Sequence, residues 1–333
     1  MSLFQLAEVR ELLRDSPLDF GAPVEQVRAV FHEMIGTHPL ARDVHFADLS
    51  LGGVPAIEVH VDTSAETAAA QSGTSSLLYF HGGAYAAGSA RDSVGLVADI
   101  VRRCGASAYT VDYRLAPEHP YPAATDDAIA AYRGLLESGV PASSIAVVGE
   151  SAGAGLAMAM LLRIKQSGLP MPAATVVLSP WCDLSLSGDS MAGKAAVDPA
   201  LTADALRTRA ESYLAGADPR SPFAGPLHAD LRGLPPLLIQ SGSFEILLDD
   251  AVRLAARAAA DDVAVSLEVC PGAPHVFQGF AEILDEAGEA LDRVATFLRN
   301  HLMAAEKART GPKVSPRRCR TTMSGPVTSA MGR

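Results

Sequence analysis

A serine lies between two glycines in residues 149–153, which read Gly-Glu-Ser-Ala-Gly. The apolar run 145–148 before it predicts a buried strand, and the composition of residues 154–165 after it predicts a helix. A G-x-S-x-G pattern at such a strand-to-helix turn is typical of a nucleophile elbow, whose tight turn requires small neighbours and holds the hydroxyl above the sheet. We therefore predict that Ser151 is a nucleophile. The similar residues 188–192 end in alanine and follow no predicted strand, so they match less well.

A serine hydroxyl is a weak nucleophile, so a base must lie within hydrogen-bond reach and a third group must hold that base in the correct tautomer. In the elbow architecture these groups follow in the order serine, acid, histidine. The histidines after Ser151 are His228, His275 and His301. His228 precedes the next predicted strand and His301 ends the last predicted helix, whereas His275 lies on a loop after the predicted strand 265–269. We predict His275 as the base.

The acid is expected between the serine and the histidine, just beyond a strand. The predicted strand 236–240 runs into a loop that contains Glu245, and Asp249 and Asp250 follow where a helix begins. The two aspartates could instead balance the dipole of that helix. We favour Glu245 and keep the aspartates as alternatives, because glutamate can orient a histidine as aspartate does.

Acyl transfer also needs hydrogen-bond donors aimed at the oxyanion that develops on the substrate. Residues 81–85 read His-Gly-Gly-Ala-Tyr and directly follow the predicted strand 76–80. Paired glycines let backbone N–H groups face a substrate without an intervening side chain. We predict Gly82 and Gly83 as donors, together with the N–H of Ala152, the residue after the nucleophile. Phosphate binding is the rival interpretation of such a turn, but no G-K-[ST] and no helix-opening G-x-G-x-x-G accompanies it.

Strands and helices alternate through most of the chain. Apolar runs predict strands over 76–80, 107–111, 145–148, 174–178, 236–240 and 265–269. Helical patterns lie over 94–103, 123–136, 154–165, 247–260 and 281–302. This alternation predicts an α/β fold with a mostly parallel central sheet flanked by helices, in which ligands bind at the carboxyl ends of the strands. Ahead of it, residues 44–61 predict an antiparallel hairpin split by Gly52 and Gly53.

Two segments outside the alternating pattern are expected to form a helical cap over the site. Two helical patterns near the N-terminus define a cap segment over residues 1–40. The connection after Trp181 is too long for a simple crossover, which predicts a second cap segment at about 184–230, with a peripheral decoration as the alternative. The catalytic domain then spans 41–303. Residues 304–333 are rich in Gly, Pro, Ser and Arg and are predicted to be a disordered basic tail.

Composition and charge argue against several classes of protein. The chain has 333 residues, of which 48% are hydrophobic, enough for a large buried core. A formal net charge of −11 argues against a nucleic-acid binder, which needs a basic face. Charged residues interrupt any signal core and no apolar run is long enough to span a membrane, so we expect a cytoplasmic protein. The four cysteines are scattered without ligand-like spacing, so we expect neither a metal site nor a disulfide framework.

Three motifs together resemble those of the hormone-sensitive-lipase-like (bacterial family IV) esterases. They are His-Gly-Gly at 81–83, Asp-Tyr-Arg-Leu-Ala-Pro-Glu at 112–118 followed by Pro-Tyr-Pro-Ala-Ala at 120–124, and Gly-Glu-Ser-Ala-Gly at 149–153. The resemblance covers roughly residues 40–302. It implies an α/β-hydrolase fold with a helical cap, hydrolysis of short-acyl carboxylic esters and no metal or organic cofactor. It also implies that residues 112–114 brace the oxyanion loop.

The chain departs from the family's pattern at two positions. Glu245 matches the first acidic position of the family's acid motif, which is usually aspartate. Ala84 stands where many members have a third glycine. Because alanine keeps its backbone N–H, the oxyanion geometry should survive the second change.

The same residues leave several alternatives open. A non-catalytic small-molecule receptor on this scaffold could dispense with the nucleophile or the base, and here both are present. Amidase or lactonase activity would use the same groups as ester hydrolysis. Tyr85, Trp181 and Phe277 lie near the expected site and could line a partly apolar substrate pocket, although aromatic residues more often pack in a core. A homodimer formed through the last strand and helix is a further open alternative.

Overall fold

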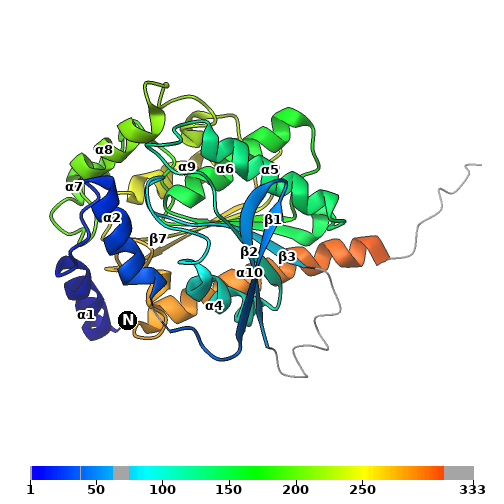
Figure 1. Ribbon diagram of the computed structural model, residues 1–333, viewed down its shortest axis with the longest axis horizontal. Helices are drawn as coiled ribbons and strands as arrows, with labels where there is room; N and C mark the ends of the chain where they lie inside the picture. The colour runs from blue at the N-terminus through cyan, green and yellow to red at the C-terminus, as the bar shows by residue number, and fades with distance from the viewer. Residues whose placement is uncertain (1, 38, 63–74, 311–333) are drawn as a thin grey trace, which may run out of the picture.

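An eight-stranded sheet forms the centre of the molecule (Figure 1). The computed structural model describes residues 2–37, 39–62 and 75–310, with side chains described as far as residue 302. The strands lie in the order β1-β2-β4-β3-β5-β6-β7-β8. Their bounds are β1 Val44–Leu51, β2 Val54–Val61, β3 Ser76–Phe80, β4 Ser107–Val111, β5 Ile145–Glu150, β6 Ala174–Leu178, β7 Leu237–Gly242 and β8 Val265–Cys270.

The sheet is mostly parallel, as the alternation of strands and helices predicts. β3 pairs in parallel with β4 and β5, and parallel pairing continues through β6 and β7 to β8. β1 and β2 form an antiparallel hairpin, and β2 is antiparallel to β4. The hairpin turn consists of Gly52 and Gly53, both with positive φ, a conformation that glycine adopts without steric cost. The predicted hairpin and the predicted parallel sheet are both confirmed.

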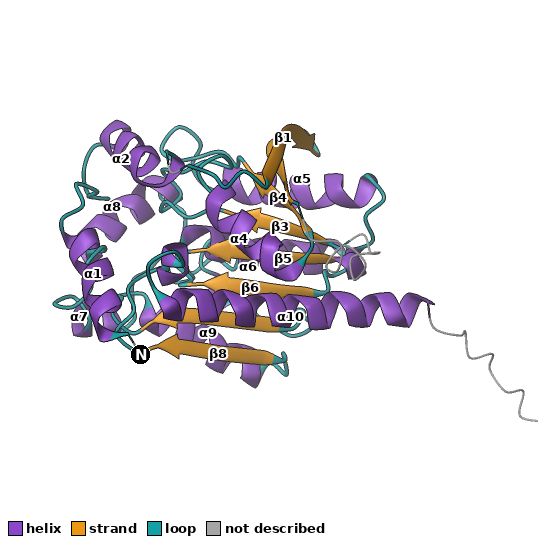
Figure 2. Ribbon diagram, turned by 90° about the horizontal axis from the view of Figure 1, so that it is seen from below, coloured by secondary structure: helices purple, strands orange, loops and turns teal. Residues whose placement is uncertain are grey.

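Helices cover both faces of the sheet (Figure 2). One face carries α4 (Val94–Cys104) and α10 (Asp285–Thr310), and the other carries α5 (Ala123–Glu137), α6 (Ala152–Ser167) and α9 (Leu248–Ala260). The pattern follows from composition, because the inner strands β3, β5 and β6 are buried on both faces and need a helix on each side. α6 is buried along most of its length, so the turn between β5 and α6 is fixed by a helix that is itself packed in the core.

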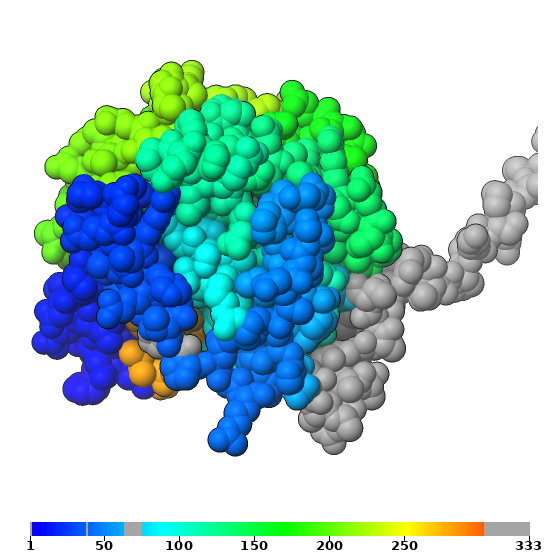
Figure 3. Space-filling view, in the orientation of Figure 1, coloured from blue at the N-terminus to red at the C-terminus, as the bar shows by residue number. Residues whose placement is uncertain are grey.

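The remaining helices gather at the carboxyl ends of the parallel strands, toward which the arrows point in Figure 2. They are α1 (Leu3–Arg14), α2 (Val24–Phe31) with the π-helix η1 (His32–Gly36), α7 (Ser190–Gly193) and α8 (Ala203–Leu214). The buried Arg209 of α8 joins the two sequence segments, because its guanidinium donates to the carbonyls of Phe20 at 2.6 Å and Ala22 at 2.5 Å. In Figure 3 the N-terminal residues and the inserted segment form one continuous surface.

The C-terminal helix differs from its predicted bounds. α10 begins at Asp285 rather than 281, and it continues to Thr310 rather than ending at 302. Residues 303–309 contain Met, three Ala, Glu, Lys and Arg, all strong helix formers, which accounts for the extension. The expected disorder therefore does not hold for residues 304–310, and the rest of the predicted tail lies outside the described residues. Within the described ranges, no helix combines the length and apolar content needed to span a membrane.

The other short elements connect the strands and helices already described. They are the 3-10 helices η2 (Ala142–Ser144), η3 (Pro226–His228) and η4 (Phe277–Phe280). η3 belongs to the inserted segment. η4 follows the loop after β8 and begins two residues after His275, the predicted base.

Candidate active site

Ser151 lies at the turn between β5 and α6, with a φ of 52° and a ψ of −120° that a non-glycine residue rarely adopts. The glycines on either side make this turn feasible. A Cβ on Gly149 would lie 2.4 Å from the carbonyl oxygen of Gly153, and a Cβ on Gly153 would lie 2.1 Å from that of Phe80. Any larger residue would force the turn away from the sheet. The hydroxyl is thereby held at the carboxyl end of β5, where the G-x-S-x-G pattern puts it.

His275 lies on the loop after β8 and reaches both other members of the predicted set. Its Nε2 lies 2.9 Å from the Oγ of Ser151, and its Nδ1 lies 2.5 Å from the Oε2 of Glu245. Because a carboxylate only accepts hydrogen bonds, Nδ1 carries the proton and Nε2 accepts from the serine hydroxyl. The structure therefore brings the serine, the histidine and the glutamate into one hydrogen-bonded chain.

The charges around His275 favour its protonated form. Burial lowers the pKa of His275, but the hydrogen bond and charge of Glu245 and the charges of Asp198 and Glu150 outweigh burial and raise this pKa above its ordinary value. An imidazole with a raised pKa is a stronger base toward a hydroxyl proton. The same charges stabilise the imidazolium that forms when the proton is taken.

The carboxylate of Glu245 is fully buried and is fixed through its second oxygen. Oε1 accepts from the backbone N–H of Gly242 at 2.7 Å, from the hydroxyl of Ser179 at 3.0 Å and from the hydroxyl of Ser241. These three donors offset the cost of burying the charge. With Oε1 occupied, Oε2 is the oxygen left to face His275.

No role for Ser179 is predicted from the sequence, yet Ser179 contacts both Glu245 and the loop that carries His275. Its hydroxyl donates to Glu245, as described above, and accepts from the N–H of Val276, the residue after the histidine, at 3.0 Å. Ser179 has a positive φ of 46°, a strained conformation of the kind found at functional sites. The signal that could have found it is its place directly after β6, at the same edge of the sheet as the other strand ends.

The two alternative acids turn away from His275. Asp249 Oδ2 accepts from the backbone N–H of Ser190 at 2.9 Å. Asp250 Oδ2 accepts from the N–H groups of Cys182 and Asp183, each at 2.8 Å, and burial raises the pKa of Asp250 to about 8. Both aspartates therefore connect α9 to the chain that follows β6 rather than to the base.

The two alternative histidines also lie elsewhere. His228 Nε2 lies 3.2 Å from Asp183 Oδ1, within the inserted segment. The ring of His301 packs against that of Phe297, with 4.5 Å between the centroids. His275 is thus the histidine that the structure pairs with Ser151.

The glycine turn after β3 lies beside the serine, but its first N–H is already engaged. Gly82 donates to Glu150 Oε1 at 3.2 Å. Within the described part of the chain, no acceptor is paired with the backbone N–H of Gly83, Ala84 or Ala152. Ala84 has a φ of 54°, so the turn holds backbone strain that alanine does not relieve. Burial raises the pKa of the Glu150 carboxyl that occupies the first N–H.

The motif at 112–114 contacts this turn through Tyr113 and the segment just beyond it through Asp112. The Tyr113 hydroxyl donates to the carbonyl of His81 at 2.7 Å, and the two rings stack with 4.2 Å between their centroids. Asp112 accepts from the N–H of Ala90 at 2.6 Å, beyond the turn. Arg114 instead pairs with a carboxylate on α5. The bracing role implied by the resemblance is therefore consistent with the contacts of Tyr113 and Asp112.

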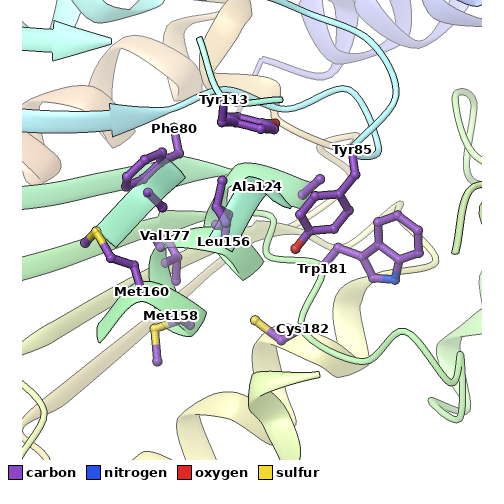
Figure 4. Packing of buried hydrophobic residues seen from close by; sticks show 14 of the residues in the cluster. Phe80, Tyr85, Tyr113, Ala124, Leu156, Met158, Met160, Val177, Trp181 and Cys182 are labelled. Atoms are coloured by element: carbon purple, nitrogen blue, oxygen red, sulfur yellow. The ribbon is translucent and has the colours of Figure 1, made fainter. Parts of the chain in front are cut away.

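The three aromatic residues considered for substrate contact are buried. Tyr85, Trp181 and Phe277 are 2%, 0% and 1% exposed. Tyr85 stacks on Tyr213 of α8 with centroids 3.9 Å apart and lies beside Trp181 (Figure 4), whereas Phe277 packs against α1. Tyr85 thereby contacts α8 and Phe277 contacts α1, and a role of the three residues in substrate binding stays a prediction.

The arrangement as a whole suits acyl transfer. A hydroxyl bonded to an imidazole nitrogen, with the other nitrogen held by a carboxylate, is how proteins make serine nucleophilic. Backbone N–H groups on two sides of the same serine supply donors for an oxyanion. Among the described residues, no three His, Cys, Asp or Glu side chains are grouped so that they could hold a metal ion.

Several known proteins are similar to the chain in sequence and structure. A family model described as the α/β-hydrolase fold matches residues 77–279. An acetyl-hydrolase of Streptomyces hygroscopicus is 46% identical over 223 residues, which are 67% of this chain and 75% of that protein. An esterase of Acinetobacter venetianus is 35% identical over 283 residues, covering 85% of this chain and 91% of the esterase.

The similarity extends to solved structures. The crystal structure of an esterase from the bacterial hormone-sensitive lipase family superposes with a TM-score of 0.84 at 40% sequence identity. The match covers 90% of this chain and 98% of that one.

Proposed function

Because this chain belongs to the α/β-hydrolase family and is, within it, a carboxylic ester hydrolase of the hormone-sensitive-lipase-like group, we propose that it cleaves short-acyl esters through an acyl-enzyme on Ser151. The observation that carries this proposal is the hydrogen-bonded chain from Ser151 through His275 to Glu245. A receptor on this scaffold would not need such a chain, and the similar proteins are named as hydrolases or esterases, so ester hydrolysis is favoured over a receptor role.

The reaction proceeds in two halves. Ser151 Oγ attacks the ester carbonyl while His275 Nε2 takes its proton, and Glu245 holds the imidazole in the required tautomer. As the tetrahedral intermediate collapses, the C–O bond to the alcohol breaks and His275 returns the proton to the leaving oxygen. Water then attacks the acyl-enzyme, giving up a proton to His275, and the carboxylic acid leaves as Oγ is reprotonated.

We assign the oxyanion donors to Gly83, Ala84 and Ala152 rather than to Gly82. The N–H of Gly82 already donates to Glu150, whereas the other three N–H groups have no acceptor within the described chain. An oxyanion requires donors that are free before the reaction, because a donor that must first leave another acceptor contributes less. Alanine at position 84 keeps the required N–H, so the departure from a third glycine is compatible with catalysis.

The rate is expected to fall at acid pH as His275 takes up a proton. His275 must be neutral to act as a base, so kcat/KM should be full above its pKa and decline as the pH falls through it. Since neighbouring carboxylates raise that pKa, the acid limb should be centred above the ordinary value of about 6.5. A profile of kcat/KM measured on p-nitrophenyl acetate checks this, and a limb centred below the ordinary value contradicts the assigned charges.

A series of p-nitrophenyl esters with a matching anilide tests the reaction class. The acetyl-hydrolase name of the Streptomyces relative supports a short acyl group, so kcat/KM is expected to be highest for acetyl or butyryl esters and to fall for decanoyl. Amide and lactone cleavage use the same groups, and p-nitroacetanilide and a γ-lactone distinguish them. A higher kcat/KM on the anilide or the lactone than on the acetyl ester would replace ester hydrolysis as the main activity.

The homodimer stays a proposal that rests on the edge of the sheet. β8 is an edge strand, and its Leu267 and Val269 side chains are 37% and 38% exposed. Exposed apolar residues on an unpaired edge favour pairing with another strand. A second copy of this chain could supply that strand without contributing to the site around Ser151.

A further inference from the structure

The inserted cap segment holds the loop that carries the predicted acid. Ile246 directly follows Glu245, and its N–H donates to Asp198 Oδ2 at 2.7 Å. The carbonyl of the same residue accepts from the hydroxyl of Ser190 at 2.5 Å. Asp198 and Ser190 both belong to the insertion between β6 and β7, so the peptide next to the acid is fixed from the cap side as well as from the sheet.

Asp198 is itself anchored, so it can act as a fixed support. Its other oxygen, Oδ1, accepts from the N–H groups of Ala200 at 2.8 Å and Leu201 at 2.9 Å, at the turn that leads into α8. One carboxylate therefore ties the approach to the cap helix to the acid loop.

Asp198 also acts on the base through its charge. The charged groups that face His275 are Glu245 from the loop after β7, Glu150 from the end of β5 and Asp198 from the cap. Each favours the imidazolium, and Asp198 in turn is affected by the charge of His275. Burial raises the pKa of Asp198, whereas its backbone hydrogen bonds oppose that rise.

We propose that Asp198 is a positioning residue through which the cap holds the loop of the acid Glu245 in register with His275. The inference rests on the proposed ester hydrolysis. It assigns the cap a part in the chemical step in addition to covering the substrate, because the peptide bond after Glu245 is held in place by a cap side chain.

Asp198→Asn separates the two contacts of the carboxylate. An asparagine side chain has one acceptor oxygen, and the N–H groups of Ala200 and Leu201 both compete for it. The amide NH₂ then faces the N–H of Ile246, donor against donor, and the link to the acid loop is lost. We expect kcat to fall by roughly tenfold to 100-fold, since a misplacement of 1 Å can cost about 100-fold, with KM changed less than kcat.

The pH profile distinguishes positioning from a structural effect. Removing the charge of Asp198 should lower the pKa of His275, so the acid limb of kcat/KM should move to lower pH in Asp198→Asn. Asp204→Asn is the matched control, because Asp204 lies on the same cap, is exposed and pairs with Arg207. The control should keep the wild-type kcat and the wild-type limb.

Asp198→Glu provides a second variant if the asparagine variant does not fold. It keeps the charge on a longer arm, so its acid limb should stay close to that of the wild type while kcat falls. The proposal is overturned if Asp198→Asn leaves either kcat or the limb unchanged, or if Asp198→Glu shifts the limb. Hydrolysis of p-nitrophenyl acetate by the wild type and by Ser151→Ala is measured alongside, to separate the role of Asp198 from the proposed function. If the wild type does not hydrolyse the ester, or if Ser151→Ala still does, the proposed function has failed, whatever the Asp198 variants show.

Discussion

Ser151→Ala is expected to lower kcat on p-nitrophenyl acetate by about 10⁶-fold, the size of loss seen when the nucleophile of a comparable serine enzyme is removed. The hydroxyl is the group that attacks the carbonyl, and His275 Nε2 loses its partner at 2.9 Å. The turn should survive, because alanine has the same Cβ as serine in this φ region. Steady-state release of p-nitrophenol, with a thermal melt of both proteins, measures the change.

Ser212→Ala is the matched control for this loss. Ser212 lies on α8, and among the described residues its hydroxyl bonds only to the carbonyl of Thr208 on the same helix. It should hydrolyse the ester at the wild-type rate. If Ser151→Ala keeps a rate within tenfold of the wild type while folded, the nucleophile has been assigned to the wrong residue.

Glu245→Gln is expected to lower kcat by about 10⁴-fold through the tautomer of the base. Oε1 of Glu245 receives three donors, from Gly242, Ser179 and Ser241, so the amide oxygen of glutamine should take that place. The amide NH₂ then faces His275 Nδ1, which must become an acceptor. Its proton moves to Nε2, which can no longer take the proton of the serine. Single-turnover and steady-state rates on p-nitrophenyl acetate measure the effect.

Asp249→Asn tests the alternative acid in the same assay. Asp249 bonds to Ser190 and not to the base, so the loss should be far smaller than for Glu245→Gln. Near-normal activity in Glu245→Gln together with collapse in Asp249→Asn would reverse the assignment of the acid.

The sequence is sufficient to predict that Ser151, Glu245 and His275 lie together, because each follows the end of a predicted strand. Ser151 follows β5, Glu245 follows β7 and His275 follows β8, and in a parallel sheet these ends meet at one edge. Chain order then left one histidine and favoured one acid. The local pattern of strands and helices is therefore enough to predict both the parallel sheet and the grouping of these three residues.

The contacts that the sequence did not predict depend on side chains from distant segments. That Gly82 donates to Glu150 depends on the register of β3 against β5, which no local pattern specifies. The support of Ile246 by Asp198 depends on the path of an irregular insertion. The burial of Trp181 likewise depends on packing against distant residues such as Tyr85, not on its position just after a strand.

The mass of the chain after reaction with an organophosphate tests the central claim most directly. A p-nitrophenyl phosphonate reacts with a serine only where a base and oxyanion donors activate it. The wild type should gain one adduct, which peptide mapping places on Ser151, with activity lost in proportion, and Ser151→Ala should gain none. An active wild type that forms no adduct, or one that is inactivated by an adduct on another residue, would contradict the account.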